Sequence, residues 1–486
     1  MVKELHQFEE DSKANVELKT KEAARSGTPW TSIYLAGGCA FIQGAQFDMF
    51  SSSMWSYLKK LNPEAMETEF GHITALYSFG QCIISPAFGY WSNRIEQVRL
   101  PLLACFVFMM AGNFIYFLLE FFTRPNVAYV MMVARFIVGC GSGNMALLSA
   151  YAAMSSSKQD RARAIAFVNG GVAIGTVVGP GFQLLFTCLG PEGVHVLPFL
   201  RLNIYNTPAL FATLLNITGF LAISFMFQEN YDVLSSLEKK DTKELPPPSL
   251  IAVLVCVSTR FVQVFVSATI GTLESAFSML MFSFNKEEAV TAYSSSDLAA
   301  GLVSIGLYFV FIFFDLKKWV PKRISTVLVM CLYACLFLFT FPWSFLPSNV
   351  EISVNGSDRG CVAERFSWCI GLKAVSPFVY YPMIVLVFGV GDSIISIALT
   401  TLYSEIIGPR RQGTLQGVLQ MSGSIGSMLA PLISSTLYTE FGPQAPWSLA
   451  IAEISMVVAL WLVFHKKMVT LRTENMSVKS TVMKES

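Results

Sequence analysis

The chain has 486 residues, of which 53% are hydrophobic and 14% are charged, and its mean hydropathy is +0.53. Soluble proteins carry about 25% charged residues, so this composition excludes a soluble protein and indicates one that lies in a lipid bilayer. Because the formal net charge is only +1 and the basic residues are scattered between apolar blocks, no nucleic-acid partner is expected.

Residues 1–29 are polar and mixed in charge, which predicts a cytosolic tail rather than a targeting segment. Twelve apolar segments follow, each close to the ~20 residues that cross a bilayer as a helix. They lie at 31–55, 69–90, 100–119, 127–153, 164–187, 205–227, 250–273, 295–314, 325–343, 376–399, 415–438 and 447–464. The longest cytosolic interruption, 228–248, separates a six-helix bundle at 30–227 from a second one at 249–464, and residues 465–486 form a C-terminal tail.

The distribution of Lys and Arg predicts the orientation of these helices. Counted on alternate sides of the membrane, one side carries 24 of the 34 basic residues and the other carries eight. The cytosolic side carries the excess, so both termini are predicted to be cytosolic. The remaining two, Arg135 and Arg260, fall inside predicted spans.

The two halves show traces of an internal repeat. At an offset of 251 residues, Gly175 pairs with Gly426 and Pro180 pairs with Pro431. Farther upstream, the stretch Gly-Ser-Gly-Asn at 141–144 is similar to Gly-Val-Gly-Asp at 389–392. Small residues let membrane helices approach closely, and repeated six-helix bundles are typical of transporters.

A short loop motif resembles the major facilitator superfamily. Between its second and third spans that family has Gly-x-x-x-Asp-Arg, and this chain has Gly89, Asn93 and Arg94 at the matching positions. Asn93 replaces the family's acid, and the basic residues that follow in the family are missing.

Two further motifs lie within spans. The fourth predicted span contains Arg135, Gly139 and Gly141, similar to the family's Arg-x-x-x-Gly-x-Gly, and the fifth ends in Gly-x-x-x-Gly-Pro at 175–180, with Gly175, Gly179 and Pro180. The resemblance implies an all-α membrane protein with the 12-helix major facilitator fold, in which two six-helix bundles are related by a pseudo-twofold axis. It also implies transport by alternating access.

From about Ser53 to Phe464 the chain also resembles a lysosomal member of that superfamily. Stretches such as Ser-Pro-Ala-Phe-Gly-Tyr-Trp-Ser-Asn at 85–93 and Leu-Tyr-Ser-Glu-Ile-Ile-Gly-Pro at 402–409 carry the similarity. It thins over spans seven to nine, where Arg260 has no counterpart. The resemblance implies a multi-pass protein of the lysosomal or late endosomal membrane.

Four ionisable residues lie inside predicted spans, where an unpaired charge costs ~2.5–3.5 kcal/mol. They are Asp48, Arg135, Arg260 and Asp392. At a rise of about 1.5 Å per residue, Asp48 lies at a depth similar to Arg135, and Asp392 at a depth similar to Arg260. Two ion pairs are therefore predicted, which either exchange protons for solute binding or only hold each half together.

Other polar side chains in the spans are candidate solute contacts, with interhelical hydrogen bonding as the alternative. These candidates are Gln43, Gln81, Asn144, Asn169 and Gln420. Glu274 and Glu453 are interpreted in two ways, as parts of a proton path or as polar contacts between helices.

The loop between spans nine and ten is predicted to lie outside the cytosol. It contains the sequon at Asn355, which is the predicted glycosylation site because the sequons at Asn216 and Asn475 fall in a span and in the C-terminal tail. Cys361 and Cys369 lie in the same loop, and in an oxidising compartment a disulfide between them is predicted, with two free thiols as the alternative.

The central cytosolic loop carries Tyr231 and Leu234 in a Tyr-x-x-bulky pattern. This resembles a sorting signal read by vesicle adaptor proteins, although such four-residue matches often arise by chance. No catalytic motif and no Cys/His cluster at metal spacing was found, so neither an enzyme activity nor a metal or cofactor is expected.

Three hypotheses for the function stay open. The first is a carrier for a small anionic or zwitterionic solute, with possible proton coupling. The second is an anion (chloride) channel on the same fold, and the third is a receptor or scaffold that transports nothing.

Overall fold

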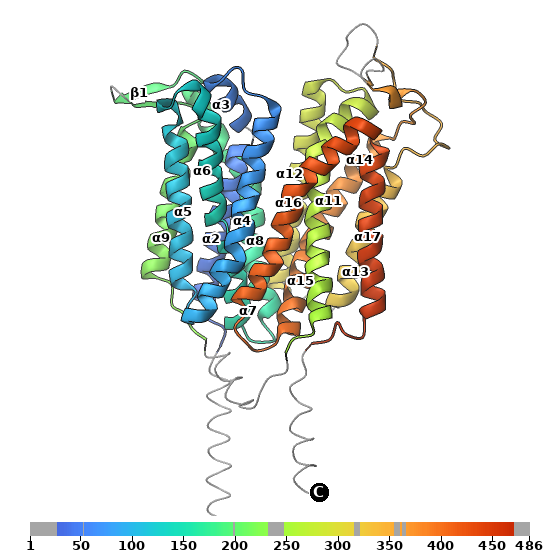
Figure 1. Ribbon diagram of the computed structural model, residues 1–486. Coiled ribbons are helices and arrows are strands. Elements are labelled where there is room, and N and C mark those ends of the chain that lie inside the picture. The colour runs from blue at the N-terminus through green and yellow to red at the C-terminus, as the bar shows by residue number, and fades with distance from the viewer. Residues whose placement is uncertain are drawn as a thin grey trace, which may run out of the picture.

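The computed structural model describes residues 27–51, 53–197, 200–231, 247–314, 321–353, 360–361 and 366–470. Long helices dominate it and form two groups side by side (Figure 1). The first group, the N-half, comprises α2 (Trp30–Ser51), α4 (Glu67–Ile95), α5 (Arg99–Phe117), α6 (Val127–Gly141), α7 (Asn144–Ser155), α8 (Arg161–Leu185) and α9 (Thr207–Phe225). The second, the C-half, comprises α11 (Leu250–Phe282), α12 (Lys286–Phe313), α13 (Lys322–Phe339), α14 (Pro377–Ile384), the π-helix η6 (Val385–Gly391), α15 (Asp392–Ile407), α16 (Gly413–Phe441) and α17 (Gln444–Phe464).

Short elements lie between the long helices. They are α3 (Met54–Leu61), the 3-10 turns η1 (Leu118–Phe121), η2 (Arg124–Asn126), η3 (Thr187–Leu189) and η5 (Ser367–Cys369), and the antiparallel hairpin of β1 (Val194–Leu197) and β2 (Leu200–Leu202). We call the end where α2 begins and α17 ends the terminal end. The opposite end carries α3 and the β1–β2 hairpin (Figure 1).

The twelve-helix prediction is confirmed. Among the described residues, nine helical stretches are long and apolar enough to cross a membrane, with α6–α7 and α14–η6–α15 each counted as one. α2, α4 and α16 are also long enough to cross a membrane, at 22, 29 and 29 residues. These three are less apolar because much of their surface packs against other helices and not against lipid, which favours Gly, Ser and Gln.

α11 and α12 are longer than the hydropathy pattern predicts. The pattern placed the end of one at residue 273 and the start of the other at 295, whereas the helices run to Phe282 and from Lys286. Asn285 caps α12 through a capping box with Glu288, which fixes the helix start within a polar stretch. The buried Glu274 accepts a hydrogen bond from Ser296, so acids that interrupt the apolar pattern still lie inside helices.

Both stretches that the internal repeat pairs, 141–144 and 389–392, lie where a helix departs from regular α-helical geometry. α6 ends at Gly141 and α7 begins at Asn144, whereas the π-helix η6 ends at Gly391 and α15 begins at Asp392. Breaks and π-turns inside helices frequently mark functional segments. The repeat therefore relates two positions at which the backbone departs from a regular α-helix.

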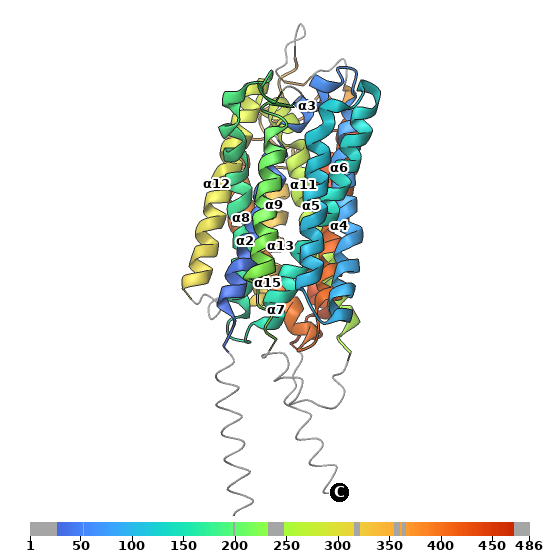
Figure 2. The ribbon, with the colours of Figure 1, turned by 90° about the vertical axis from the view of Figure 1, so that its left-hand side faces the viewer.

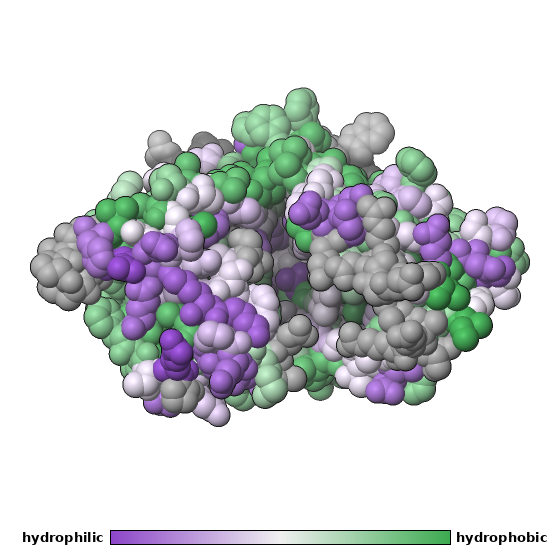
Figure 3. Space-filling view, turned by 90° about the horizontal axis from the view of Figure 1, so that it is seen from above, coloured by the Kyte–Doolittle hydropathy of each residue, from purple (hydrophilic) through white to green (hydrophobic). Residues whose placement is uncertain are grey.

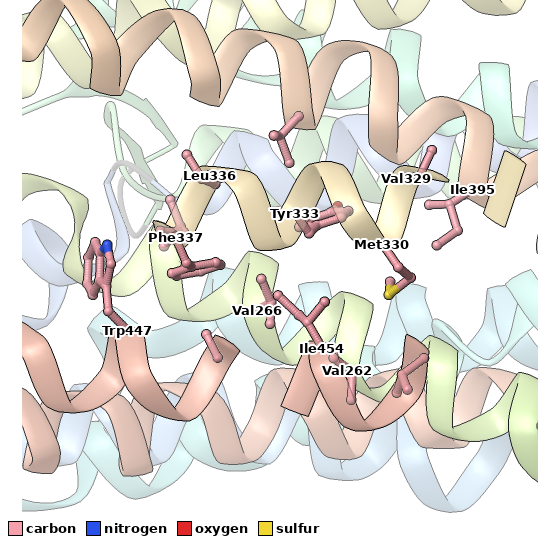
Figure 4. Close-up of a cluster of buried hydrophobic side chains, with 14 of the residues drawn as sticks. Val262, Val266, Val329, Met330, Tyr333, Leu336, Phe337, Ile395, Trp447 and Ile454 are labelled. Carbon is pink, nitrogen blue, oxygen red and sulfur yellow. The ribbon is translucent and has the colours of Figure 1, made fainter. Parts of the chain in front are cut away.

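A compact apolar core holds the C-half together (Figure 4). It joins α11, α13, α15 and α17, and Trp447 is fully buried in it, with its ring stacked on Phe277 at 4.6 Å between centroids. The indole N–H of Trp447 donates to the hydroxyl of Thr340 at 2.8 Å, which satisfies the one polar atom that this side chain buries.

The two halves meet along α4 with α16 and along α8 with α12, which lie side by side in both views (Figures 1 and 2). On α4 and α16 the contacts extend from mid-helix to the terminal end, where Gly89 faces Gly413. On α8 and α12, Gly170 packs on Tyr308 and Gly301 on Val177. From the opposite end the surface is hollowed between the halves (Figure 3). Because the contacts of α4 with α16 continue to the terminal end, this conformation is closed there.

Candidate functional site

Arg135 lies on α6 in the N-half with 5% of its surface exposed. Its guanidinium carbon lies 4.9 Å from the ring centroid of Tyr77 and 5.3 Å from that of Phe50. Within the described part of the chain no carboxylate lies at ion-pair distance from Arg135, and its Nε atom has no hydrogen-bond partner. Aromatic ring faces stabilise a cation, but they do not neutralise it.

The predicted ion pair between Asp48 and Arg135 is therefore wrong. Asp48 is directed toward α8 and the C-half: a Cβ built on Gly179 would lie 3.2 Å from the Cβ of Asp48, and Asp297 of α12 is close enough for the two charges to interact. Equal depth in the membrane does not place two residues on facing sides of their helices, because side chains turn about 100° per residue around a helix.

A hydrogen-bond network surrounds the break between α6 and α7. The amide nitrogen of Gln43 donates to the Ser142 hydroxyl at 2.7 Å and to the Tyr77 hydroxyl at 3.0 Å. The amide nitrogen of Gln81 donates to the Ser142 carbonyl at 3.4 Å, and its oxygen accepts from Ser424 of α16 at 3.0 Å. Two of the predicted polar candidates thus lie in one network that reaches across to the C-half.

The remaining candidates are not part of this network. Asn144 is fully buried, and neither polar atom of its side chain has a partner among the described residues. Asn169 and Gln420 are half-buried on α8 and α16. The contact of these three side chains with a solute stays a prediction.

In the C-half, Arg260 and Asp392 are joined through a third residue. Arg260 donates from Nη1 to the amide oxygen of Gln263 at 3.0 Å, and the amide nitrogen of Gln263 donates to Oδ1 of Asp392 at 2.5 Å. The Tyr333 hydroxyl donates to the same carboxylate oxygen at 3.0 Å. The predicted direct pair is thus replaced by a bridge, because Gln263 lies one turn from Arg260 on α11 and carries both an acceptor and a donor.

Sequence reasoning did not identify Gln263, Tyr333, Tyr77 or Ser142 as parts of the site. Only the spacing of Arg260 and Gln263, three residues apart on one helix, offered a signal, since such residues share a helix face. Ser142 lies between Gly141 and Gly143, and these glycines had been interpreted only as sites of close helix packing.

The motif glycines bring backbones together inside the N-half. A Cβ on Gly139 would lie 2.1 Å from a backbone oxygen of α4, and one on Gly141 would lie 2.7 Å from a backbone oxygen of α5. On α8, Cβ atoms on Gly175 and Gly179 would lie 2.4 Å and 2.7 Å from backbone oxygens of α2, and Pro180 lies inside the same helix. These residues set helix spacing, and Gly139 also packs on the backbone of Tyr77, whose hydroxyl belongs to the polar network.

The loop motif between α4 and α5 lies at the contact between the halves. The Asn93 side chain accepts from the backbone N–H of Gly413 at 2.9 Å and donates to the Thr414 hydroxyl at 2.9 Å. Asn93 therefore caps the start of α16 from the other half, and the amide makes both contacts without a charge. Arg94 is exposed.

Arg411 makes a second contact between the halves at the terminal end. It forms an ion pair with Glu96 at 2.9 Å, and its guanidinium carbon lies 5.4 Å from the ring centroid of Tyr231. Burial and the neighbouring Glu229 raise the pKa of the Tyr231 phenol above its ordinary value, and the hydroxyl donates to Glu229 at 3.0 Å. Leu234, the other half of the predicted sorting signal, lies outside the described residues.

Beyond the opposite end, the sulfur atoms of Cys361 and Cys369 are bonded, with their Cα atoms 5.9 Å apart. The predicted glycosylation site, Asn355, lies outside the described residues.

Comparison with known proteins relates the chain to one family. Residues 36–357 match the family model of the Major Facilitator Superfamily. Major facilitator superfamily domain-containing protein 8 of Xenopus laevis is 28% identical over 503 residues, which cover 96% of each chain. The class B tetracycline resistance protein of Escherichia coli is 21% identical over 82% of this chain and 87% of its own. The crystal structure of the human organic anion transporter MFSD10 covers 88% of this chain and 98% of its own, with a TM-score of 0.61 at 15% identity.

Proposed function

Because the chain belongs to the major facilitator superfamily, a family of membrane transporters, we propose that it is a carrier for a small anionic or zwitterionic solute that works by alternating access. The observation that carries this proposal is the state of Arg135. Its guanidinium is buried beside two aromatic rings and has no acidic partner in the part of the chain that is described. A charge in the membrane needs a partner or a watery cavity, and an anionic group of the solute would supply that partner.

Alternating access is supported by the asymmetry of the contacts between the halves. Asn93, Arg411 and the glycines of α4 and α16 join the halves at the terminal end, while the opposite end is hollowed (Figure 3). The positive-inside count assigns the terminal end to the cytosol. In the proposed cycle this conformation is therefore open to the far side, which is the lysosomal or late endosomal lumen according to the sequence resemblance.

Proton coupling would act through the bridge in the C-half. Gln263 holds Arg260 with its oxygen and Asp392 with its nitrogen. Protonation of Asp392 would remove the negative charge that orients the Gln263 amide, which would weaken the hold on Arg260. Arg260 would then be free to contact an anionic solute.

The test compares small-molecule contents of organelles purified from cells with the native protein, without it, and with Arg135→Gln. Accumulation or depletion of the same anion in the deletion and in Arg135→Gln is expected. Charge-assisted hydrogen bonds contribute about 1.5–3 kcal/mol, so flux of that solute should fall ~10- to 150-fold. Arg124→Gln, which changes an exposed arginine on η2, is the matched control and should behave as native.

Two outcomes would replace the proposal. Unchanged contents in both the deletion and Arg135→Gln would favour a receptor or scaffold. Single-channel currents from reconstituted protein, in place of saturable flux, would favour the anion channel. Vesicle adaptor proteins remain proposed partners, and they would require Tyr231 to leave its contacts with Arg411 and Glu229.

A further inference from the structure

A cavity of about 620 Å³, open to the surface of the molecule on one side, lies between α12 and the α14–η6 segment of the C-half. Its volume is in the range of small-molecule binding sites. Its lining includes Val303, Leu386 and Val390, which lie toward the middle of the helices, and Ser296 and Tyr381, which lie nearer the opposite end. The cavity is therefore apolar along most of its length and carries hydroxyl groups toward one end.

The wall formed by α14 and η6 is irregular. Pro382 lies inside α14 and has no backbone N–H to donate, and three residues later the seven-residue π-helix Val385–Gly391 begins. π-helical segments are rare and are often found where a helix binds something. This irregularity is local to the cavity, because regular α-helix resumes at Asp392.

Acidic groups lie directly behind the hydroxyl groups. The hydroxyl of Ser296 is 3.3 Å from Oε1 of Glu274, whose side chain is only 2% exposed. Asp297 follows Ser296 in sequence and lies close enough to Glu274 for their charges to interact. Neither acid has a cation at ion-pair distance among the residues that are described. The hydroxyl of Tyr380, buried near Glu274, also has no partner there.

We propose that this cavity binds a single-chain amphiphilic amine. Its hydrocarbon chain would lie along Val303, Leu386 and Val390, and its ammonium group would bond to the hydroxyls of Ser296 and Tyr381. An ammonium about 2.9 Å from Ser296 lies within about 6 Å of the Glu274 carboxylate, given the 3.3 Å contact between them. The charge of the ligand would compensate the buried carboxylate of Glu274, and its hydrocarbon chain would fill the apolar part of the cavity.

This site is separate from the solute site proposed above. It lies within the C-half alone, and it selects a cation, whereas Arg135 and Arg260 select an anion. The proposal therefore stands whether or not the solute of the carrier is an anion.

The experiment uses full-length protein in phosphatidylcholine nanodiscs and two photoreactive probes. One is dodecylamine with a diazirine in its chain, and the other is the matching dodecanol. After irradiation, labelled peptides are mapped by mass spectrometry. The amine should label residues 292–303 and 381–390, and free dodecylamine, but not dodecanol, should compete.

Glu274→Gln should weaken amine labelling about tenfold or more, since a charge pair at this distance is lost, and should leave labelling by the alcohol unchanged. Glu453→Gln, which neutralises a half-buried acid on α17 away from the cavity, is the control and should label as native. Equal labelling by both probes, or an unchanged Glu274→Gln, would overturn the proposal and indicate a site for lipid acyl chains. If Glu274→Gln does not fold, the comparison of amine with alcohol on native protein decides.

Discussion

Replacing Gly89 with Ala should force the two halves apart at the terminal end. A Cβ on Gly89 would lie 2.2 Å from the carbonyl oxygen of Gly413, 2.6 Å from its carbonyl carbon and 3.0 Å from the nitrogen of Thr414. All three are backbone atoms of α16, so no side chain can rotate away. The closest distance would have to grow from 2.2 Å to about 3.4 Å, where ordinary contact begins.

The clash lies between the halves, so a rocking motion relieves it without unfolding either bundle. Overpacking of this kind costs about 1–3 kcal/mol, which would shift the equilibrium away from this conformation by ~5- to 150-fold. Spin labels at the exposed Arg94 and Lys466 report the distance across the terminal end. In Gly89→Ala that distance should increase. The distance between a second pair of spin labels, at Arg124 and Glu440 at the opposite end, should decrease.

Gly175→Ala is the matched control. A Cβ there would lie 2.4 Å from the backbone oxygen of Phe41 and 2.6 Å from the nitrogen of Ala45, but both atoms belong to the N-half. The cost therefore falls on the folding of that half, and thermal stability should drop while the label distances keep their native distribution. The reasoning fails if Gly89→Ala leaves both distances unchanged, or if Gly175→Ala shifts them equally.

Three further substitutions test the contacts between and within the halves. Gln263→Leu removes the bridge to Asp392 and should destabilise the C-half by about 1–3 kcal/mol, measured as a lower unfolding temperature; an unchanged temperature would mean that the bridge does not form. Asn93→Asp places a negative charge at the start of α16, which should stabilise the closed terminal end by about 0.3–1 kcal/mol and shorten the same label distance that Gly89→Ala lengthens. Arg411→Gln loses an ion pair whose partner, Glu96, is 71% exposed, so the terminal end should open only slightly, by less than about 1 kcal/mol, and a large opening would contradict this estimate.

Hydropathy was sufficient to predict the twelve helices, because helices that face lipid must be apolar along their length. It was misleading where a helix faces protein. The ends of α11 and α12 extend past Glu274 and Asp297, and an average over neighbouring residues cannot distinguish an acid held by Ser296 from one that ends a span. The repeat of glycines was more informative than expected, since both matched stretches, 141–144 and 389–392, lie at irregular helix segments.

The charged residues of the spans were found by sequence, but their partners were not. Depth along a helix follows from counting residues, whereas the direction of a side chain depends on the rotation of the whole helix. The rotation of α2 places Asp48 near Gly179 and Asp297 and not near Arg135. For Arg260 the sequence search missed Gln263, because it considered only charged residues. Gln263 is neutral, yet it connects Arg260 to Asp392 through two hydrogen bonds.

Arg135 and Arg260 therefore differ in what an anion must displace to bind them in the proposed carrier. An anion that binds Arg135 displaces no acidic partner among the described residues, and the rings of Phe50 and Tyr77 already lie beside the guanidinium. An anion that binds Arg260 must compete with Gln263, and Gln263 also holds Asp392. Solute binding is thus expected to begin in the N-half, and only its transfer to Arg260 would disturb the acid of the C-half. In that order, solute movement and protonation of Asp392 become coupled when the solute reaches Arg260 and the hydrogen bonds of Gln263 break.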